Sequence, residues 1–244
     1  MVPVAEPVPA LALVPGLNNS RRVWEVVVEG IGTAARCHAF DCPPLETVEE
    51  VADALLAQLP PRFFLCGFSF GGYVALAMLE RALERVAGLA LVNTGATADN
   101  EAQRAARQKA IATAQAGGHE AMVAAQASVV FHAASLANSA MMQTRMQMVR
   151  EYGAERLIAH ARACMARPDR TAVAAGARCP LLVVAAADDR VIPTAVQKAF
   201  AQSLPAARYV EIAAAGHMLP LEQPAALAEA LRTWLGAATA ATPA

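Results

Sequence analysis

Residues 62–78 of this 244-residue chain read RFFLCGFSFGGYVALAM, and this stretch decides the fold. Its first five residues are a short apolar run that predicts a buried strand, and its last six have the pattern of a helix. Between them, residues 67–71 match GxSxG around Ser69. Flanking glycines permit a strand-to-helix turn so tight that the serine backbone is strained and its Oγ is exposed. An incidental serine in a glycine-rich turn is the alternative, but the strand and helix on either side favour a nucleophile.

A serine hydroxyl is a weak nucleophile at neutral pH, so the motif predicts a histidine base and a carboxylate that orients it. Of the five histidines, His38 falls in a predicted strand, and His119, His132 and His160 fall in a helical segment where a surface or hydrogen-bonded role is expected. His217 differs because its loop follows the last predicted strand and precedes the last helix. Such loops lie at the carboxyl edge of a parallel sheet, where ligands bind. We therefore expect His217 to be the base.

The carboxylate is expected in the loop after the strand-like run 181–185, where Asp188 and Asp189 are adjacent. Either aspartate could instead be a surface turn acid, or could lie near the N-cap of the helix expected to begin near Thr194. The pattern of residues alone leaves both aspartates as candidates for the acid.

Short apolar runs bounded by turn residues alternate with amphipathic stretches along the chain. The predicted strands are residues 11–14, 36–40, 62–66, 86–92, 181–185 and 208–212. The predicted helices include residues 47–59, 73–83, 194–204 and 224–235. Alternating strands and helices predict an α/β fold, a mostly parallel sheet of about six strands with helices on both faces.

Residues 99–170 break this alternation, because they have helical composition and no strand candidate. We expect a core formed by residues 10–98 and 171–236, into which 99–170 is inserted as a helical cap. The insert holds nine Lys+Arg and six Asp+Glu, so the basic residues of a nearly neutral chain are in excess there. The ends, residues 1–9 and 237–244, are rich in Pro, Ala and Thr and are expected to be poorly ordered.

Composition excludes several classes of protein. With 20 Lys+Arg against 21 Asp+Glu, the charge does not favour a nucleic-acid partner. The five cysteines form no CxxC pair, so neither a disulfide framework nor a metal is expected. The start lacks the charged region of a signal peptide, and polar residues interrupt the uncharged stretch 121–144, which we expect to be a pair of apolar helices. The sequence predicts a cytoplasmic protein without a membrane partner, and nothing in it indicates a homo-oligomer.

A second glycine motif in the sequence suggests a rival function. Residues 30–35 match the looser dinucleotide-binding pattern GxGxxA after an apolar run, which would suggest an oxidoreductase. The next residues read RCHAF and are followed by Pro43 and Pro44, which leaves no room for the helix that should hold the pyrophosphate. No cofactor is therefore expected.

Along nearly all of its length the sequence resembles the α/β-hydrolase superfamily. Residues 67–72 resemble the family's nucleophile elbow, residues 186–193 its acid loop and residues 216–224 its histidine loop. The resemblance assigns the acid to Asp189 rather than Asp188. The chain order of Ser69, Asp189 and His217 is then the order of nucleophile, acid and base in that family.

The resemblance also extends to the first strand, where residues 13–17 resemble the loop that stabilises the oxyanion. It implies that the backbone N–H groups of Leu17 and Phe70 form the oxyanion hole. The side chains of Asn18 and Asn19 are alternative donors, although a turn-forming role is the favoured interpretation for both.

The sequence departs from the family's pattern at four points. Pro15 and Phe68 stand where the family commonly has histidines, and Ala186 stands where it often has glycine. Phe68 should make the floor of the pocket more apolar. About ten residues precede the first predicted strand, so the family's N-terminal antiparallel hairpin is expected to be missing.

The resemblance implies a serine hydrolase that cleaves a carboxylic ester, thioester or lactone of a small to medium acyl substrate through an acyl-enzyme on Ser69. One alternative is cleavage of a carbon–carbon bond in a diketone by the same triad. Another is a binding protein that kept the fold without catalysis.

The cap offers two further hypotheses about the substrate. Its methionines could line an acyl pocket, with ordinary helix core as the alternative: Met122, Met141, Met142, Met146 and Met148. Its arginines could bind a carboxylate of the substrate, with a solvated helix face as the alternative: Arg145, Arg150, Arg162 and Arg167.

Overall fold

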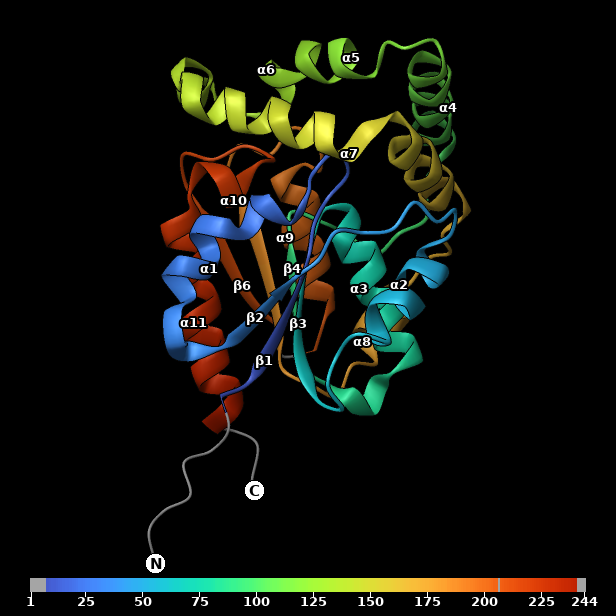
Figure 1. The fold of residues 1–244 in the computed structure, drawn as a ribbon. Helices are drawn as coiled ribbons and strands as arrows, with labels where there is room; N and C mark the ends of the chain where they lie inside the picture. Colours follow the sequence, from blue (N-terminus) through green and yellow to red (C-terminus); the bar gives the residue numbers. More distant parts are fainter. Residues whose placement is uncertain (1–7, 206, 241–244) are drawn as a thin grey trace, which may run out of the picture.

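The computed structural model describes residues 8–205 and 207–240, and a six-stranded parallel sheet forms the centre of this part of the chain (Figure 1). The strands are β1 (Ala10–Val14), β2 (Arg36–Ala39), β3 (Phe63–Phe68), β4 (Val86–Val92), β5 (Leu181–Ala186) and β6 (Arg208–Ile212). Their order is β2-β1-β3-β4-β5-β6, and each neighbouring pair is parallel. The predicted α/β fold with about six strands is confirmed.

Helices cover both faces of the sheet (Figure 1). One face packs against α2 (Val48–Leu56), α3 (Phe70–Arg81), α8 (Thr171–Ala175) and α9 (Thr194–Ser203); the other packs against α1 (Glu25–Ile31), α10 (Leu219–Glu222) and α11 (Pro224–Ala240). β3 shows why the strands are continuous apolar runs. Phe63 and Leu65 belong to the core on one face, and Phe64 and Cys66 belong to the core on the other.

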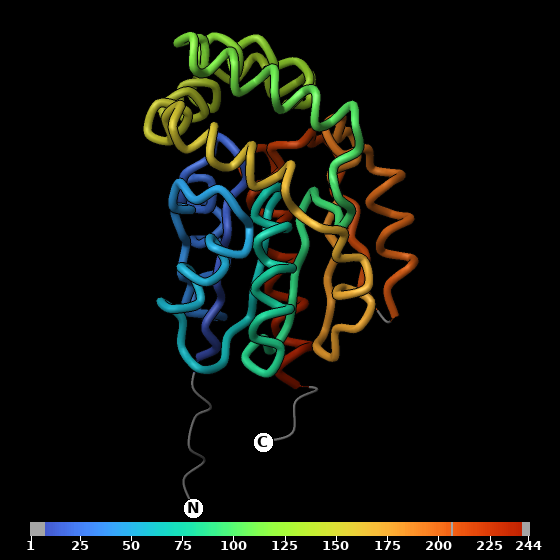
Figure 2. Tube along the Cα trace, turned by 90° about the vertical axis from the view of Figure 1, so that its right-hand side faces the viewer, coloured from blue at the N-terminus to red at the C-terminus, as the bar shows by residue number. Residues whose placement is uncertain are grey.

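Four helices lie across the carboxyl ends of the strands, and we call them the cap helices (Figures 1 and 2). They are α4 (Glu101–Gln115), α5 (His119–Ala125), α6 (Ala127–Val130) and α7 (Ser139–Ala166). α7 kinks at Gly153, whose φ of 76° is a conformation that glycine adopts readily. The stretch 121–144 is not the expected pair of helices, because it is divided among α5, α6, a 3-10 turn at Ala133–Ala137 and the start of α7. The boundaries of the cap at 99 and 170 stay a prediction.

The expectation of poor order from residue 237 onward is wrong for residues 237–240, because α11 continues to Ala240. Alanine is the strongest helix former, and Ala238 is buried in the core on the α1 face. At the other end, residues 8 and 9 lead directly into β1. The rest of the two predicted ends, residues 1–7 and 241–244, lies outside the described residues. No helix in the described part of the chain is long and apolar enough to cross a membrane.

The order of the strands fixes where a ligand can bind. The chain leaves β1 toward β2 on one side of the sheet. It then returns to form β3 on the other side of β1, and leaves β3 toward β4, away from β1. The loops after β1 and β3 therefore diverge at the carboxyl edge, which is the position where open parallel sheets form a ligand crevice. The cap helices lie directly over this edge (Figure 2).

Candidate active site

The turn between β3 and α3 holds Ser69 in a strained backbone conformation. Its φ of 52° and ψ of −116° lie in a region that residues other than glycine rarely adopt. The glycines around it permit close approach of the backbone: a Cβ atom on Gly67 would collide with the carbonyl of Gly71, and one on Gly71 would collide with the carbonyl of Val14. The N–H of Ser69 donates to the carbonyl of Val92, which ties the turn to β4. The close packing and the hydrogen bond to β4 therefore hold the backbone of Ser69 in one position.

The structure brings together Ser69, His217 and Asp189, which come from three different loops. His217 Nε2 lies 2.9 Å from Ser69 Oγ. His217 Nδ1 lies 2.9 Å from Asp189 Oδ2. A histidine whose Nδ1–H is held by a carboxylate presents its Nε2 lone pair to the serine hydroxyl, so the histidine can accept the serine proton.

Asp189 is buried, and both oxygens of its carboxylate accept hydrogen bonds. Its Oδ1 accepts hydrogen bonds from the N–H groups of Val191 and Ile192, at 2.8 and 2.9 Å. Its Oδ2 accepts a further one from the Gln197 amide at 3.0 Å, besides the contact with the histidine. Asp188 is exposed instead, and its carboxylate lies 3.7 Å from His132 Nε2. Of the two adjacent aspartates, only Asp189 therefore contacts His217.

Asn93, which follows β4, joins the loops of the acid and the histidine, a role that no sequence pattern indicated. The residue is fully buried, and its φ of 44° is one that asparagine tolerates better than most residues. Its Oδ1 accepts from the N–H of Ala186 at 2.8 Å. Its Nδ2 donates to the carbonyl oxygens of His217 at 2.9 Å and Gly216 at 3.3 Å. One amide therefore fixes both loops relative to β4.

Glu222 is a second residue that sequence reasoning missed, and it joins the histidine loop to the cap. One carboxylate oxygen accepts from the N–H of Gly216 at 2.8 Å, and the other accepts from the N–H of His132 at 2.7 Å. The two segments are in close contact, since a Cβ atom on Gly216 would lie 2.7 Å from the His132 nitrogen. The cap is thus held against the loop that carries His217.

The two backbone groups expected to form an oxyanion hole both lie beside Ser69. Phe70 is the first residue of α3, where N–H groups have no partner within the helix. Leu17 is the second residue of a turn closed by the hydrogen bond from the Asn19 N–H to the Gly16 carbonyl, which leaves the Leu17 N–H unused by the turn. Gly16 keeps this loop close to the nucleophile, because a Cβ atom there would lie 3.1 Å from Ser69 Cβ.

Asn18 and Asn19 take the turn-forming role that the sequence favours. Asn18 has a positive φ of 57°, and Asn19 Nδ2 donates to the carbonyl of Leu17 at 2.8 Å. Asn18 Oδ1 lies 2.7 Å from His119 Nε2. These side chains are therefore engaged within the loop and with the cap.

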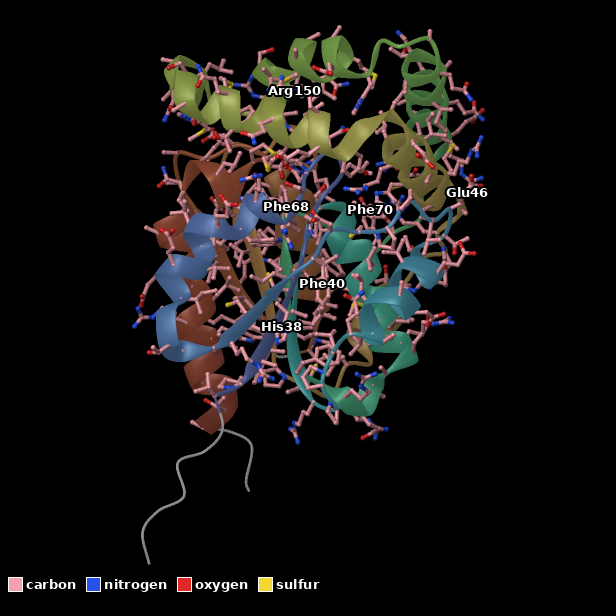
Figure 3. The ribbon with its side chains drawn as sticks, in the orientation of Figure 1. His38, Phe40, Glu46, Phe68, Phe70 and Arg150 are labelled. Carbon is pink, nitrogen blue, oxygen red and sulfur yellow. The ribbon has the colours of Figure 1, made fainter. Side chains whose placement is uncertain are left out.

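Aromatic side chains on either side of Ser69 shape the site beneath the cap helices (Figure 3). The ring of Phe68 lies 5.4 Å from that of His217, so the floor beneath the base is apolar. The ring of Phe70 stacks on that of His160, with 4.6 Å between centroids. His160 is fully buried between Tyr152 Oη at 2.6 Å and the Pro43 carbonyl at 2.7 Å, and burial lowers the pKa of His160 to about 4. His160 is thus a neutral, hydrogen-bonded core residue, as expected for the histidines of the insert.

One cavity lies between the sheet and the cap, and another lies among the cap helices. Ser69 and His217 line one of about 390 Å³, together with the loop 17–19 and Val130. The other, of about 220 Å³, has an apolar lining that includes Met142, Met146 and Phe131. Arg145 and Val130 belong to the walls of both. Two of the five predicted methionines thus line a cavity, whereas Met148 is fully buried core.

Three similar proteins indicate what this architecture is used for elsewhere. A pimeloyl acyl-carrier-protein methyl ester esterase of Nitrosomonas europaea is 33% identical over 92 residues; the match spans 34% of this chain and only 36% of the esterase. The structure superposes on a thermophilic esterase of Thermogutta terrifontis with malate bound, with a TM-score of 0.89, 26% identity and coverage of 94% and 90% of the two chains.

An enol-lactonase of Burkholderia xenovorans superposes with a TM-score of 0.84 and 22% identity, covering 94% of this chain and 92% of the lactonase. At that identity the likeness shows the fold alone. The sequence model described as the alpha/beta hydrolase family matches residues 11–230, which is most of the chain and includes the elbow, the acid loop and the histidine loop. This chain therefore belongs to the alpha/beta hydrolase family of enzymes.

Proposed function

We propose that this protein is a serine hydrolase that cleaves a carboxylic ester, thioester or lactone of a small to medium acyl substrate. The observation that carries the proposal is the pair of 2.9 Å contacts that link Ser69 Oγ, His217 and Asp189. The strained backbone of Ser69 and its position on the wall of a cavity add support, because strain of this kind is retained where function requires it. The names of two relatives, both esterases, are in keeping with this class of reaction.

In the first half of the proposed reaction, Ser69 Oγ attacks the carbonyl carbon of the substrate as His217 Nε2 takes its proton. Asp189 stays ionised and stabilises the imidazolium through Nδ1–H. The oxygen of the tetrahedral intermediate accepts hydrogen bonds from the N–H groups of Leu17 and Phe70, and the helix dipole of α3 favours the negative charge at that end. His217 then returns the proton to the leaving alcohol or thiol.

In the second half, a water molecule replaces the leaving group beside His217. The histidine removes a proton from this water, which attacks the acyl-enzyme carbonyl and forms a second tetrahedral intermediate at the same oxyanion site. Collapse of this intermediate releases the acid and returns the proton to Ser69. Phe68 packs beneath the imidazole throughout, and this apolar contact limits the positions that the ring can take.

The shape of the site favours a small-molecule substrate. A cavity of about 390 Å³ at the nucleophile fits an acyl group of a few carbon atoms, and the adjoining apolar cavity of about 220 Å³ extends the space into the cap. Methionine side chains adapt to varied apolar shapes, so Met142 and Met146 suit an acyl chain.

The proposal is tested by labelling and by a panel of substrates. A fluorophosphonate should label the wild-type protein and not Ser69→Ala, whereas Ser203→Ala, a change at an exposed serine at the end of α9, should be labelled like the wild type. The panel holds p-nitrophenyl esters of increasing chain length, an enol-lactone and a ring-fission diketone. Turnover of esters or the lactone supports the proposal. Turnover of the diketone alone would assign carbon–carbon bond hydrolysis, and neither labelling nor turnover would indicate a binding protein on this fold.

A further inference from the structure

Arg145, on the cap helix α7, is a buried cation at the boundary of the two cavities. Its exposed fraction is only 7%, and it lines both the cavity that contains Ser69 and His217 and the apolar cavity beside it. It is the one residue of the four cap arginines considered from the sequence that lines either of the two cavities. This position places a positive charge within the space open to a substrate.

The partners of Arg145 are neutral. Its Nη1 donates to the carbonyl oxygen of Asn18 at 2.5 Å and to Asn19 Oδ1 at 2.7 Å. Among residues 8–205 and 207–240, no carboxylate lies within ion-pair distance of its guanidinium. Burial lowers the pKa of Arg145 to about 10, which still leaves the side chain cationic at neutral pH. A buried charge without a counterion is destabilising, so its retention needs an explanation.

Three other arginines of the cap make the contrast clear, because each pairs with an acid. Arg150 faces Glu120 on α5 and stands on the upper side of α7, away from the sheet (Figure 3). Arg162 pairs with Glu46, an exposed residue that precedes α2 outside the cap. Arg167 is as buried as Arg145, but its Nη1 lies 2.6 Å from Asp99 Oδ1. Arg104 and Arg156 also have no ion pair with an acid in the described part of the chain, but neither lines either cavity. Among these arginines, Arg145 is the one that combines the lack of an acid with a place on the cavity walls.

Part of the Arg145 guanidinium is free for a ligand. Only Nη1 bonds to an acceptor in the described part of the protein, and Nε and Nη2 have neither a protein acceptor nor complete burial. Nε and Nη2 form one edge of the planar fork, and that edge matches the two oxygens of a carboxylate. His119, which contacts Asn18, is a further group near Arg145, and burial lowers its pKa below the usual range, so it adds no second positive charge at pH 7. The single positive charge of Arg145 therefore matches a ligand group with one negative charge, such as a carboxylate.

We infer that Arg145 binds a carboxylate of the substrate. The preferred substrates are then esters or lactones whose acyl part also carries an ionised carboxylate. This inference rests on the proposed function and names the substrate class of the same site. Because Arg145 is anchored to Asn18 and Asn19, directly after Leu17 in the loop beside the nucleophile, it fixes the distance between the carboxylate and the carbonyl that is attacked. Arg145 acts as a specificity-determining residue.

A purely structural role is the competing explanation, because Arg145 also braces the loop that contains Leu17. The two roles differ in what they affect. Loss of a brace lowers kcat/KM for every substrate by a similar factor, whereas loss of a carboxylate partner lowers it selectively for the anionic substrate. The selectivity between two esters that differ only in charge is therefore the decisive quantity.

The test compares methyl hydrogen adipate with methyl hexanoate, two esters that share the leaving group and the length of the acyl chain. The wild type should prefer the adipate ester, and Arg145→Met should lower the ratio of the two kcat/KM values by roughly 10- to 100-fold. Arg145→Lys should restore part of the ratio, because it keeps the charge but not the planar fork. The matched control is Arg150→Met, which removes a cap charge from the same helix and should leave the ratio unchanged.

Salt separates Arg145 from the exposed arginines of the cap. Buried ion pairs are screened much less than exposed ones, so the preference should persist in 0.5 M NaCl. The inference is overturned if the wild type shows no preference, if Arg145→Met affects both esters equally, or if salt abolishes the preference.

A binding measurement keeps this inference distinguishable from failure of the proposed function. Calorimetric titration with free adipate reports on the carboxylate site without turnover, and wild-type binding should be lost in Arg145→Met and retained in Arg150→Met. If the esters are not hydrolysed and Ser69 is not labelled, the proposed function fails while this binding result still decides the role of Arg145. Equal adipate binding by the wild type and Arg145→Met would overturn the inference.

Discussion

The side-chain amide of Asn93 donates a hydrogen bond of 2.9 Å to the backbone carbonyl of His217, 124 residues further along the chain. The same amide accepts from the N–H of Ala186, so the end of β4 holds both the histidine loop and the start of the acid loop. The position of the base therefore depends on a residue whose side chain, within the described part of the chain, hydrogen-bonds to neither Ser69 nor Asp189. We regard Asn93 as a positioning residue.

Asn93→Ala should lower the free energy of unfolding by about 3 kcal/mol. The change leaves buried partners at Ala186 and His217 unpaired, each at about 1–3 kcal/mol, and puts alanine at a positive φ. It should also lower kcat at least about tenfold, because the loop carrying His217 loses its tether. The measurements are urea unfolding and ester turnover. Asn138→Ala, which removes the N-cap of α7, is the control and should cost about 1 kcal/mol with kcat unchanged.

Ser69→Ala should abolish turnover, because a triad without its nucleophile loses several orders of magnitude in rate. Its stability should change little, since Ser69 contributes more to chemistry than to packing. Ser69→Gly should be inactive as well, but more stable than Ser69→Ala by about 1 kcal/mol, because glycine relieves the strain at φ 52°. Unfolding of both variants in urea checks the second expectation. Retention of more than about a hundredth of the wild-type rate in Ser69→Ala would refute the proposed nucleophile.

The adjacent aspartates should respond very differently to the same change. Asp189→Asn replaces the oxygen that faces His217 Nδ1 and favours the wrong tautomer, so kcat should fall by roughly four orders of magnitude. Asp188→Asn is the matched control, because that side chain is exposed and faces His132 rather than His217, and its effect should be mild. Steady-state kinetics on one ester decides the matter. A larger loss in Asp188→Asn would place the acid one residue earlier.

Features with a local cause could be predicted from the sequence. Each strand of a sheet buried on both faces is an apolar run, so the six runs located the six strands, with shifts such as 62–66 against Phe63–Phe68. The turn around Ser69 was predictable because its glycines are required by contacts within a few residues and with β1. The choice of Asp189 came from resemblance, since two adjacent aspartates have the same local pattern.

Features that depend on distant contacts could not be predicted. Asn93 and Glu222 act through loops that only the folded chain brings together, and nothing in their neighbours indicates those partners. The same holds for Arg145, whose sequence neighbourhood resembles that of Arg150, although one is buried beside the nucleophile and the other is paired on the surface. The helix at residues 237–240 was missed because an Ala-rich end has the composition of a tail, while packing on the core makes it a helix.

The last prediction concerns pH and His160, the buried histidine that stacks on Phe70. Its Nδ1 accepts from the Tyr152 hydroxyl and its Nε2–H donates to the Pro43 carbonyl, which is the pattern of a neutral ring. Burial lowers its pKa to about 4 in the folded protein, against 6.5 for the ordinary group. The unfolded chain therefore binds a proton as the pH falls below 6.5, while the folded protein does so only near 4.

The sign follows from that difference: the titration of His160 does not change stability above about pH 7, and it destabilises the protein progressively between pH 6.5 and 4, by about 3 kcal/mol in total. Below pH 4 both states are protonated at this residue, and the loss from His160 stops. Urea unfolding of the wild type and His160→Gln across pH 7.5 to 4.5 measures the effect. The variant should start less stable but lose stability less steeply, whereas Asn138→Ala, which replaces no titratable group, should follow the wild-type slope. Equal slopes in the wild type and His160→Gln would mean that the folded protein protonates His160 as readily as the unfolded chain, against its burial and its two hydrogen bonds.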